Sequence, residues 1–139
     1  MTASSARSTT VNTSLPGQEQ GRCRKQVRRV GWDSALEADI QVLAGLGPTR
    51  FGHVVAHEHT HALIHLNGTA PVDPALEEGV CEMVAVVWLT NRATSREQLQ
   101  QVWNNPHPIY GGQMRRAVRA ARRYGVGVTL HSILTAGRL

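Results

Sequence analysis

Residues able to bind a metal ion gather in one stretch of the chain. VVAHEHTHALIHL, residues 54–66, holds four histidines and a glutamate among apolar residues. Within it His57, Glu58 and His61 form the pattern His-Glu-x-x-His, and on a helix the two histidines lie one turn apart on the same face. Two imidazoles placed in this way can hold one Zn²⁺ ion, and the glutamate beside the first can serve as general base. The alternative interpretation is a histidine-rich core segment without chemistry.

A catalytic zinc site also needs a third protein ligand and an open position for water. The stretch LEEGVCE, residues 76–82, offers carboxylates after a turn that lets a second helix fold back beside the first. This order is similar to that of thermolysin-like peptidases, the gluzincins, in which a small residue often follows the ligand. Glu78 is followed by glycine and Glu77 is not, so we predict Glu78 as the third ligand. Glu82, one turn later, is expected to accept the free ring N–H of His57 and fix its tautomer.

Two predicted helices carry these residues. Apolar residues recur at helical intervals over 50–66, where Thr49 can cap the start and an Asn-Gly pair can end the helix. Asp73 is a good N-cap, and the proline after it a good first residue, for a second helix over 75–92. Further helices are expected over residues 96–103, 113–125 and 128–137, and a loop over residues 104–112.

The segment before the first helix is ambiguous. Residues 31–48 could hold a short helix from Ala35 or a strand that ends at a Gly-Pro pair, and the alternation of Ile40 and Val42 with polar neighbours favours the strand. The predicted fold class is therefore mainly α (α+β), a thermolysin-like zincin helical core with at most a small sheet element. Only residues 39–46 could then provide the edge strand along which such peptidases bind the substrate backbone.

Length and composition indicate one domain preceded by a tail. The chain has 139 residues, of which 41% are hydrophobic and 4% aromatic, enough for one modest core. Residues 1–30 are rich in Ser, Thr and Gln and then basic, so we expect a disordered basic tail there and the zinc metallopeptidase-like domain over 31–139. No stretch resembles a signal peptide or reaches the roughly 18 apolar residues of a membrane span, so a cytoplasmic location is expected.

The net charge of +5 is concentrated in two basic clusters, residues 22–29 and 115–123. Such clusters can bind nucleic acid or an acidic partner. No aromatic platform or known nucleic-acid motif accompanies them, so a solvated tail and helix face is the simpler interpretation. The two cysteines, Cys23 and Cys81, are too few for a Cys-type zinc site or a disulfide scaffold. Cys81 is expected to be a small buried hydrophobe.

A longer resemblance surrounds the metal motif. FGHVVAHEHTHALIHLNG, VDPALEEGVCEMVAVVWL and PIYGGQMRRAVRAARRYGVGVTL are similar to the C-terminal peptidase domain of plant LIM-domain, ubiquitin-activated peptidases that limit organ size, the DA-one-like family. The shared pattern has an apolar lead-in, Ala-His-Glu-x-x-His-Ala, a loop, Glu-Glu-Gly-x-Cys and a Trp-Leu ending. The resemblance covers roughly residues 40–135 and implies a gluzincin-type zinc peptidase acting on proteins. The family's LIM module and ubiquitin-interacting helix are not recognised in this sequence, so a link to ubiquitin is not expected.

Other residues near the motif are assigned lesser roles. His53 and His65 continue the four-residue spacing but lie one turn too far along the helix axis to be ligands, so they are expected to flank the site or form hydrogen bonds nearby. Tyr110 is a candidate catalytic donor to an oxyanion, and otherwise a packing residue. Surface, core or structural places are expected for His59, His107, His131, Arg115, Trp88 and Met83.

These features predict a zinc-dependent metallopeptidase with one Zn²⁺ per chain and a protein or peptide as substrate. His57, His61 and Glu78 hold the ion, and Glu58 activates water. The alternative is a catalytically inactive zinc-binding domain that interacts with another protein, which the short region before the motif motivates. A basic nucleic-acid-binding helical protein is a weaker third interpretation, because such a protein needs no general base beside a metal.

Overall fold

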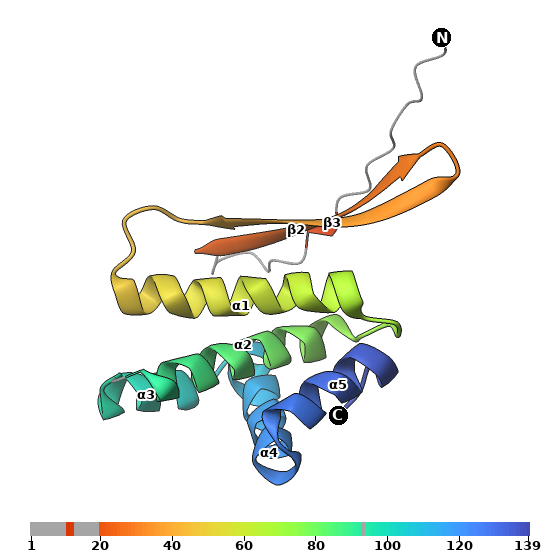
Figure 1. The fold of residues 1–139 in the computed structure, drawn as a ribbon. Helices are drawn as coiled ribbons and strands as arrows, with labels where there is room; N and C mark the ends of the chain where they lie inside the picture. Colours follow the sequence, from red (N-terminus) through yellow and green to blue (C-terminus); the bar gives the residue numbers. More distant parts are fainter. Residues whose placement is uncertain (1–10, 13–19, 93) are drawn as a thin grey trace.

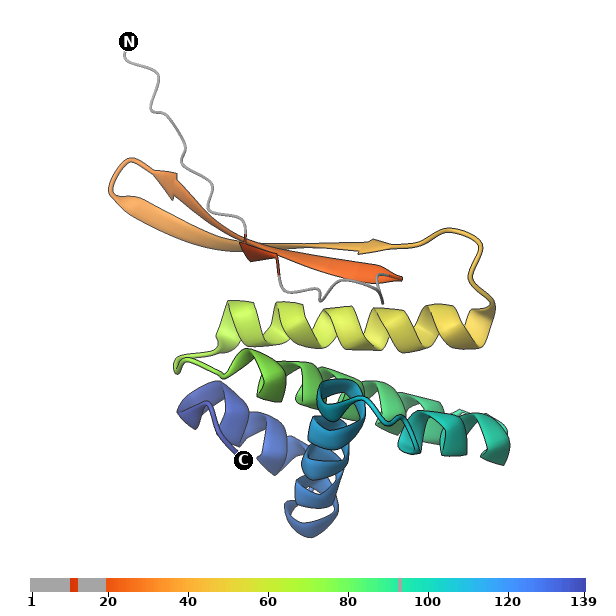
Figure 2. The same cartoon turned by 180° about the vertical axis from the view of Figure 1, so that it is seen from behind.

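Helices dominate the structure, and a small antiparallel sheet covers one of them. The computed structural model describes residues 11–12, 20–92 and 94–139. The elements are β1 (Val11–Asn12), β2 (Gly21–Val30), β3 (Asp33–Val42), α1 (Pro48–Asn67), α2 (Pro74–Asn91), α3 (Arg96–Trp103), the π-helix η1 (Pro108–Gln113), α4 (Met114–Tyr124) and α5 (Val126–Ala136). The β2–β3 hairpin lies along one side of α1, and α2 packs on the other side with the remaining helices beyond it (Figures 1 and 2). The predicted mainly helical fold class is confirmed.

The hairpin is the main part of the sheet. β2 and β3 pair antiparallel along their whole length, and the turn between them begins with Gly31, whose φ of +63° suits the first position of a tight hairpin turn. β1 pairs with two residues of β2, so the strand order is β1-β2-β3 and β3 lies at an edge. The predicted strand is confirmed, although it spans Asp33–Val42 rather than 39–46, and the alternative helix from Ala35 is wrong.

The prediction of a disordered tail over residues 1–30 is wrong for residues 21–30, which form strand β2 of the sheet. Cys23 and Lys25 are buried, while the arginine between them is partly exposed, the alternation expected of a strand with one covered face. This period is weak in the sequence because the inward positions hold a cysteine and a lysine instead of a row of apolar residues. Residues 1–10 and 13–19 of the predicted tail lie outside the described part of the chain.

The two helices with the metal motif begin close to the predicted positions. α1 starts at Pro48 with Gly47 as its N-cap, so the prediction of Thr49 as cap is wrong. Pro48 takes the first helical position because its missing N–H would have no partner there in any case. α2 starts at Pro74 as predicted, and the Asp73 carboxylate accepts hydrogen bonds from two N–H groups of the first turn at 3.0 and 3.2 Å.

The hydrophobic core lies between α1, α2, α4 and α5. Its buried members are Ile64, Leu76, Val80, Cys81, Met83, Met114, Ala117, Val118 and Ile133. Cys81 is therefore buried and Met83 is a core residue, as predicted. Trp88 packs where α1 and α2 meet, with its ring directly against Gly52. Among the described helices, none is both long and apolar enough to cross a membrane.

Gly79 lies where α2 meets η1. The small residue that follows Glu78 makes room for η1, because a Cβ atom at this position would lie 2.6 Å from the backbone carbon of Gln113. We expect Gly79→Ala to lower the free energy of unfolding by about 1–3 kcal/mol through this overlap, as measured by urea denaturation without metal. The control is Gly112→Ala, where a Cβ would meet nothing within 4 Å and should not destabilise the protein. Equal stability of the Gly79→Ala variant and the native protein would contradict the expectation.

Candidate metal centre

Two histidines of α1 and one glutamate of α2 meet between these helices. The Nε2 atoms of His57 and His61 are 3.2 Å apart. One carboxylate oxygen of Glu78 lies 3.1 Å from Nε2 of His57, and the other lies 3.3 Å from Nε2 of His61. All three side chains are buried. The structure thus brings together the three residues that the motif spacing nominated as ligands.

The other nitrogen of each ring faces a further carboxylate of α2. His61 Nδ1 lies 2.7 Å from Oε1 of Glu77, at hydrogen-bond distance. His57 Nδ1 lies 2.7 Å from Oε1 of Glu82, an ion-pair contact whose atoms are not aligned as in a regular hydrogen bond. Ionised carboxylates only accept, so each ring carries a proton on Nδ1 and turns Nε2 toward Glu78. Glu77 and Glu78 therefore occupy different places: Glu78 faces both Nε2 atoms, and Glu77 faces the back of one ring.

Strand β2 contributes a residue that the sequence analysis missed. Lys25 is only 9% exposed, and its Nζ contacts Oε1 of Glu77, the atom that also lies against His61. Burial by itself raises the pKa of Glu77, but the hydrogen bonds from His61 and Lys25 outweigh burial and lower that pKa below its ordinary value. Glu77 is thus held ionised behind the ring of His61. Lys25 stands in a run of basic residues whose other members are partly or fully exposed, so only the alternation of the strand could have indicated it.

Glu58 lies on α1 beneath the start of β2. Its side chain is buried and accepts a hydrogen bond from the backbone N–H of Cys23. Gly21 packs directly on it, because a Cβ at Gly21 would lie 2.9 Å from Glu58 Cγ. Burial raises the pKa of Glu58 above its ordinary value, and the opposing effect of His57 and His61 does not cancel the rise. A carboxylate with increased proton affinity beside the ligand cluster suits the role of general base.

The carboxylates around His57 favour a proton on its imidazole ring. Burial lowers the pKa of His57, but its contacts with Glu78 and Glu82 outweigh this and raise the pKa to about 10. Burial likewise opposes ionisation of Glu78, yet its histidine partners lower its pKa to about 2. Burial by itself raises the pKa of Glu82, but its contacts with His53 and His57 outweigh burial and hold that pKa far below its usual range. His57 is therefore an imidazolium near neutral pH, and a metal ion must displace a proton to bind.

Cys81 offers a different third ligand. Its sulfur and one nitrogen each of His57 and His61 lie within 4.8 Å of one another, and all three residues are buried, so this group could hold a metal ion. Burial raises the pKa of the Cys81 thiol well above its ordinary value, and the nearby carboxylates of α2 raise it further. The thiol therefore keeps its proton unless a metal displaces it.

Tyr110 lies beside His57, within the segment predicted as a loop. That prediction is wrong for residues 108–112, which form η1 together with Gln113. His107 caps this segment by accepting hydrogen bonds from two backbone N–H groups at 3.2 and 3.3 Å. The ring centroid of Tyr110 is 6.4 Å from that of His57 and 5.0 Å from that of His107. Arg115 donates to two backbone carbonyls at 2.8 and 2.9 Å, a structural role.

The remaining histidines of α1 lie as the helical spacing predicts. His53 and His65 flank the ligand pair: His53 Nε2 is 3.1 Å from Oε2 of Glu82, and His65 Nε2 is 3.2 Å from the carbonyl oxygen of Gln26. His59 is exposed on the opposite face. Both flanking histidines therefore form hydrogen bonds outside the cluster of nominated ligands.

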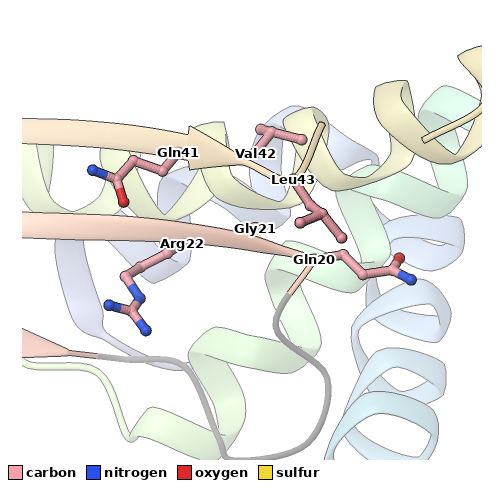
Figure 3. A pocket seen from close by; sticks show the side chains of 6 residues that line it. All are labelled: Gln20, Gly21, Arg22, Gln41, Val42 and Leu43. Carbon is pink, nitrogen blue, oxygen red and sulfur yellow. The ribbon is translucent and has the colours of Figure 1, made fainter. Parts of the chain in front are cut away.

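A pocket of about 340 Å³ lies at the open end of the hairpin (Figure 3). The side chains of Arg22 and Gln41 extend from neighbouring strands there, as their cross-strand pairing requires. The lining residues are Gln20, Gly21, Arg22, Gln41, Val42 and Leu43. Gly21, which packs on Glu58, is one of these lining residues.

The motif and the two helices that carry it fall within a region shared with a known family. Residues 10–101 match the family model named DA1-like, described as Protein DA1. This match covers well over half of the chain, which therefore belongs to the DA1-like family. The resemblance inferred from the sequence is confirmed.

Plant proteins are among its relatives. Protein DA1 of Arabidopsis thaliana is 28% identical over 129 residues, covering 71% of this chain and 24% of that protein. Protein DA1-related 2 of the same plant is 27% identical over 134 residues, covering 70% and 25%. The LIM domain-containing protein HDR3 of Oryza sativa subsp. japonica is 25% identical over 136 residues, covering 70% and 27%. The chain thus spans about a quarter of the length of these relatives. No solved structure matches it significantly.

Proposed function

We propose that this domain is a zinc-dependent metallopeptidase that hydrolyses peptide bonds in protein substrates. The proposal is carried by one observation: the Nε2 atoms of His57 and His61 and the carboxylate of Glu78 lie 3.1 to 3.3 Å from one another. Glu58, the candidate general base, is on the same helix. Membership of the DA1-like family supports the proposal, since resemblance to that family implies a gluzincin-type peptidase.

The spacing of these atoms fits a zinc ion. Nitrogen and oxygen ligands of a tetrahedral zinc ion stand about 2.0–2.2 Å from the metal and hence about 3.3 Å from one another. His57, His61 and Glu78 would hold the ion and leave one position for water, as in catalytic sites. We prefer Glu78 to Cys81 as third ligand because each of its carboxylate oxygens lies within 3.3 Å of an Nε2 atom. The Cys81 sulfur and the histidine nitrogens are grouped less tightly, within 4.8 Å of one another.

The protein groups around this position suit peptide hydrolysis. A bound zinc ion supplies Lewis acidity, which lowers the pKa of water and polarises a carbonyl group. Glu58 takes the proton of the attacking water and passes it to the leaving amine. The N–H of Cys23 orients the Glu58 carboxylate.

A second function is favoured by Cys81. A fourth protein ligand would close the zinc site and exclude water, which is the arrangement of structural zinc sites. The domain would then be a catalytically inactive zinc-binding module for interaction with another protein. Such a protein would bind zinc and leave a diverse peptide library uncleaved.

Metal content tests the proposal directly. We expect purified protein reconstituted with zinc to hold about one zinc per chain by mass spectrometry. The double variant His57→Ala/His61→Ala, which lacks both imidazoles, should hold none. If the native protein holds no zinc after reconstitution, the histidines serve packing alone and the proposed function is wrong.

A separate prediction concerns Tyr110. If its phenol donates to the developing oxyanion, Tyr110→Phe should lower kcat by roughly 10²-fold, while zinc affinity stays at the native value. Cleavage of a peptide library by the zinc-loaded protein provides the rate. Tyr124→Phe, at a tyrosine that is 57% exposed, is the control and should retain full activity. Full activity of the Tyr110→Phe variant would leave Tyr110 a packing residue.

A further inference from the structure

The carboxylate of Glu82, on α2, lies between two histidines of one face of α1. His57 Nδ1 lies 2.7 Å from one of its carboxylate oxygens, Oε1. His53, one turn earlier on α1 and only 6% exposed, places its Nε2 atom 3.1 Å from the other oxygen, Oε2. Both ring nitrogens of His53 thus have partners outside the three proposed ligands, and one of these partners, Glu82, faces the back of His57.

Arg50 determines which nitrogen of His53 carries the proton. Arg50 Nη1 is 3.3 Å from His53 Nδ1, and a guanidinium group can only donate hydrogen bonds. The Nδ1 atom must accept, so Nε2 carries the proton and donates to Glu82. The hydrogen bonds thus run in one direction, from Arg50 through His53 to Oε2 of Glu82. The other carboxylate oxygen stays available to His57.

We propose that His53 is a positioning residue of the metal centre, which holds the Glu82 carboxylate against His57 and so keeps Nε2 of His57 turned toward the metal. The inference rests on the proposed function, because it takes His57 as a zinc ligand. A glutamate bound through one oxygen alone can rotate about its flexible stem. Its second bond, to His53, removes that freedom. Partners that orient a metal-ligating histidine typically change metal affinity or activity by about 10–100-fold.

The test is the zinc dissociation constant of the full chain, measured by competition with a chromogenic chelator. His53→Leu removes the donor and should weaken zinc binding by about tenfold. His53→Gln places an amide N–H₂ close to the native Nε2 position, so it should restore affinity to within about threefold of the native protein. His65→Leu is the matched control: His65 is a flanking histidine of the same helix that binds a backbone carbonyl, and its loss should leave zinc affinity unchanged.

A double variant separates positioning from a general structural effect. In the Glu82→Gln background, His53→Leu should cause no further loss of zinc affinity, because its effect passes through the Glu82 carboxylate. Should His53→Leu fail to fold, His53→Asn, whose side chain is too short to reach Glu82, takes its place with the same expected loss. Native zinc affinity in the His53→Leu and His53→Asn variants would overturn the inference about His53. So would an equal loss of affinity in the native and Glu82→Gln backgrounds. Neither result would affect the proposed function. A native protein that binds no zinc would overturn the proposed function as well.

Discussion

Replacing Glu58 with Gln is expected to abolish most peptide hydrolysis while leaving zinc bound. The amide keeps the size and the hydrogen-bonding oxygen of the side chain but cannot take a proton from water. General base catalysis typically contributes about 10²–10⁴-fold, and we expect kcat to fall by that factor. The dissociation constant for zinc should change little, because Glu58 does not face the Nε2 atoms as Glu78 does.

The rate and the metal content must be measured on the same preparation. Glu97→Gln, the same chemical change at an exposed position of α3, is the control and should retain full activity. Retained activity in the Glu58→Gln variant would exclude Glu58 as the base even if zinc is bound. Loss of zinc in that variant would show that Glu58 contributes to metal binding, which the structure does not indicate.

The residues of the candidate metal centre that lie on α1 and α2 could be predicted from the sequence, because their arrangement follows from the helical period and one short turn. His57 and His61 are four residues apart on a helix, so their common face follows from the helical period alone. Asp73 and Pro74 mark the start of α2, and the short turn before them forces α2 back along α1. Once both helices are placed, the carboxylates of α2 must meet the imidazoles of α1.

The part contributed by the sheet and by η1 could not be predicted in the same way. Lys25 reaches Glu77 only because β2 packs along α1. Pairing between distant segments leaves no periodic trace in the sequence when the inward residues are a cysteine and a lysine. η1 depends on the ring of His107 capping backbone N–H groups in a stretch whose prolines and glycines favour a loop. The close contact between Gly79 and η1 likewise cannot be predicted from the spacing of residues in the sequence.

The identity of the third ligand has the largest expected effect on metal binding. Glu78 faces Nε2 of both His57 and His61, whereas Glu77 faces Nδ1 of His61 and the Nζ atom of Lys25. Glu77→Gln weakens an orienting contact, and we expect zinc affinity to fall by about 10–100-fold. Glu78→Gln removes a ligand charge and should weaken zinc binding by more than that range.

Three variants compared in one zinc titration decide between the available ligands. Glu77→Gln serves as the matched control for Glu78→Gln, since the same charge is removed one residue earlier on the same helix. Cys81→Ala should bind zinc nearly as tightly as the native protein if Glu78 completes the site and water takes the fourth position. If instead Cys81→Ala shows the greatest loss, the thiolate is the ligand and the interaction-module function gains support. If Glu77→Gln shows the greatest loss, Glu77 must turn from the ring of His61 to the metal when zinc binds, and the assignment of Glu78 is wrong.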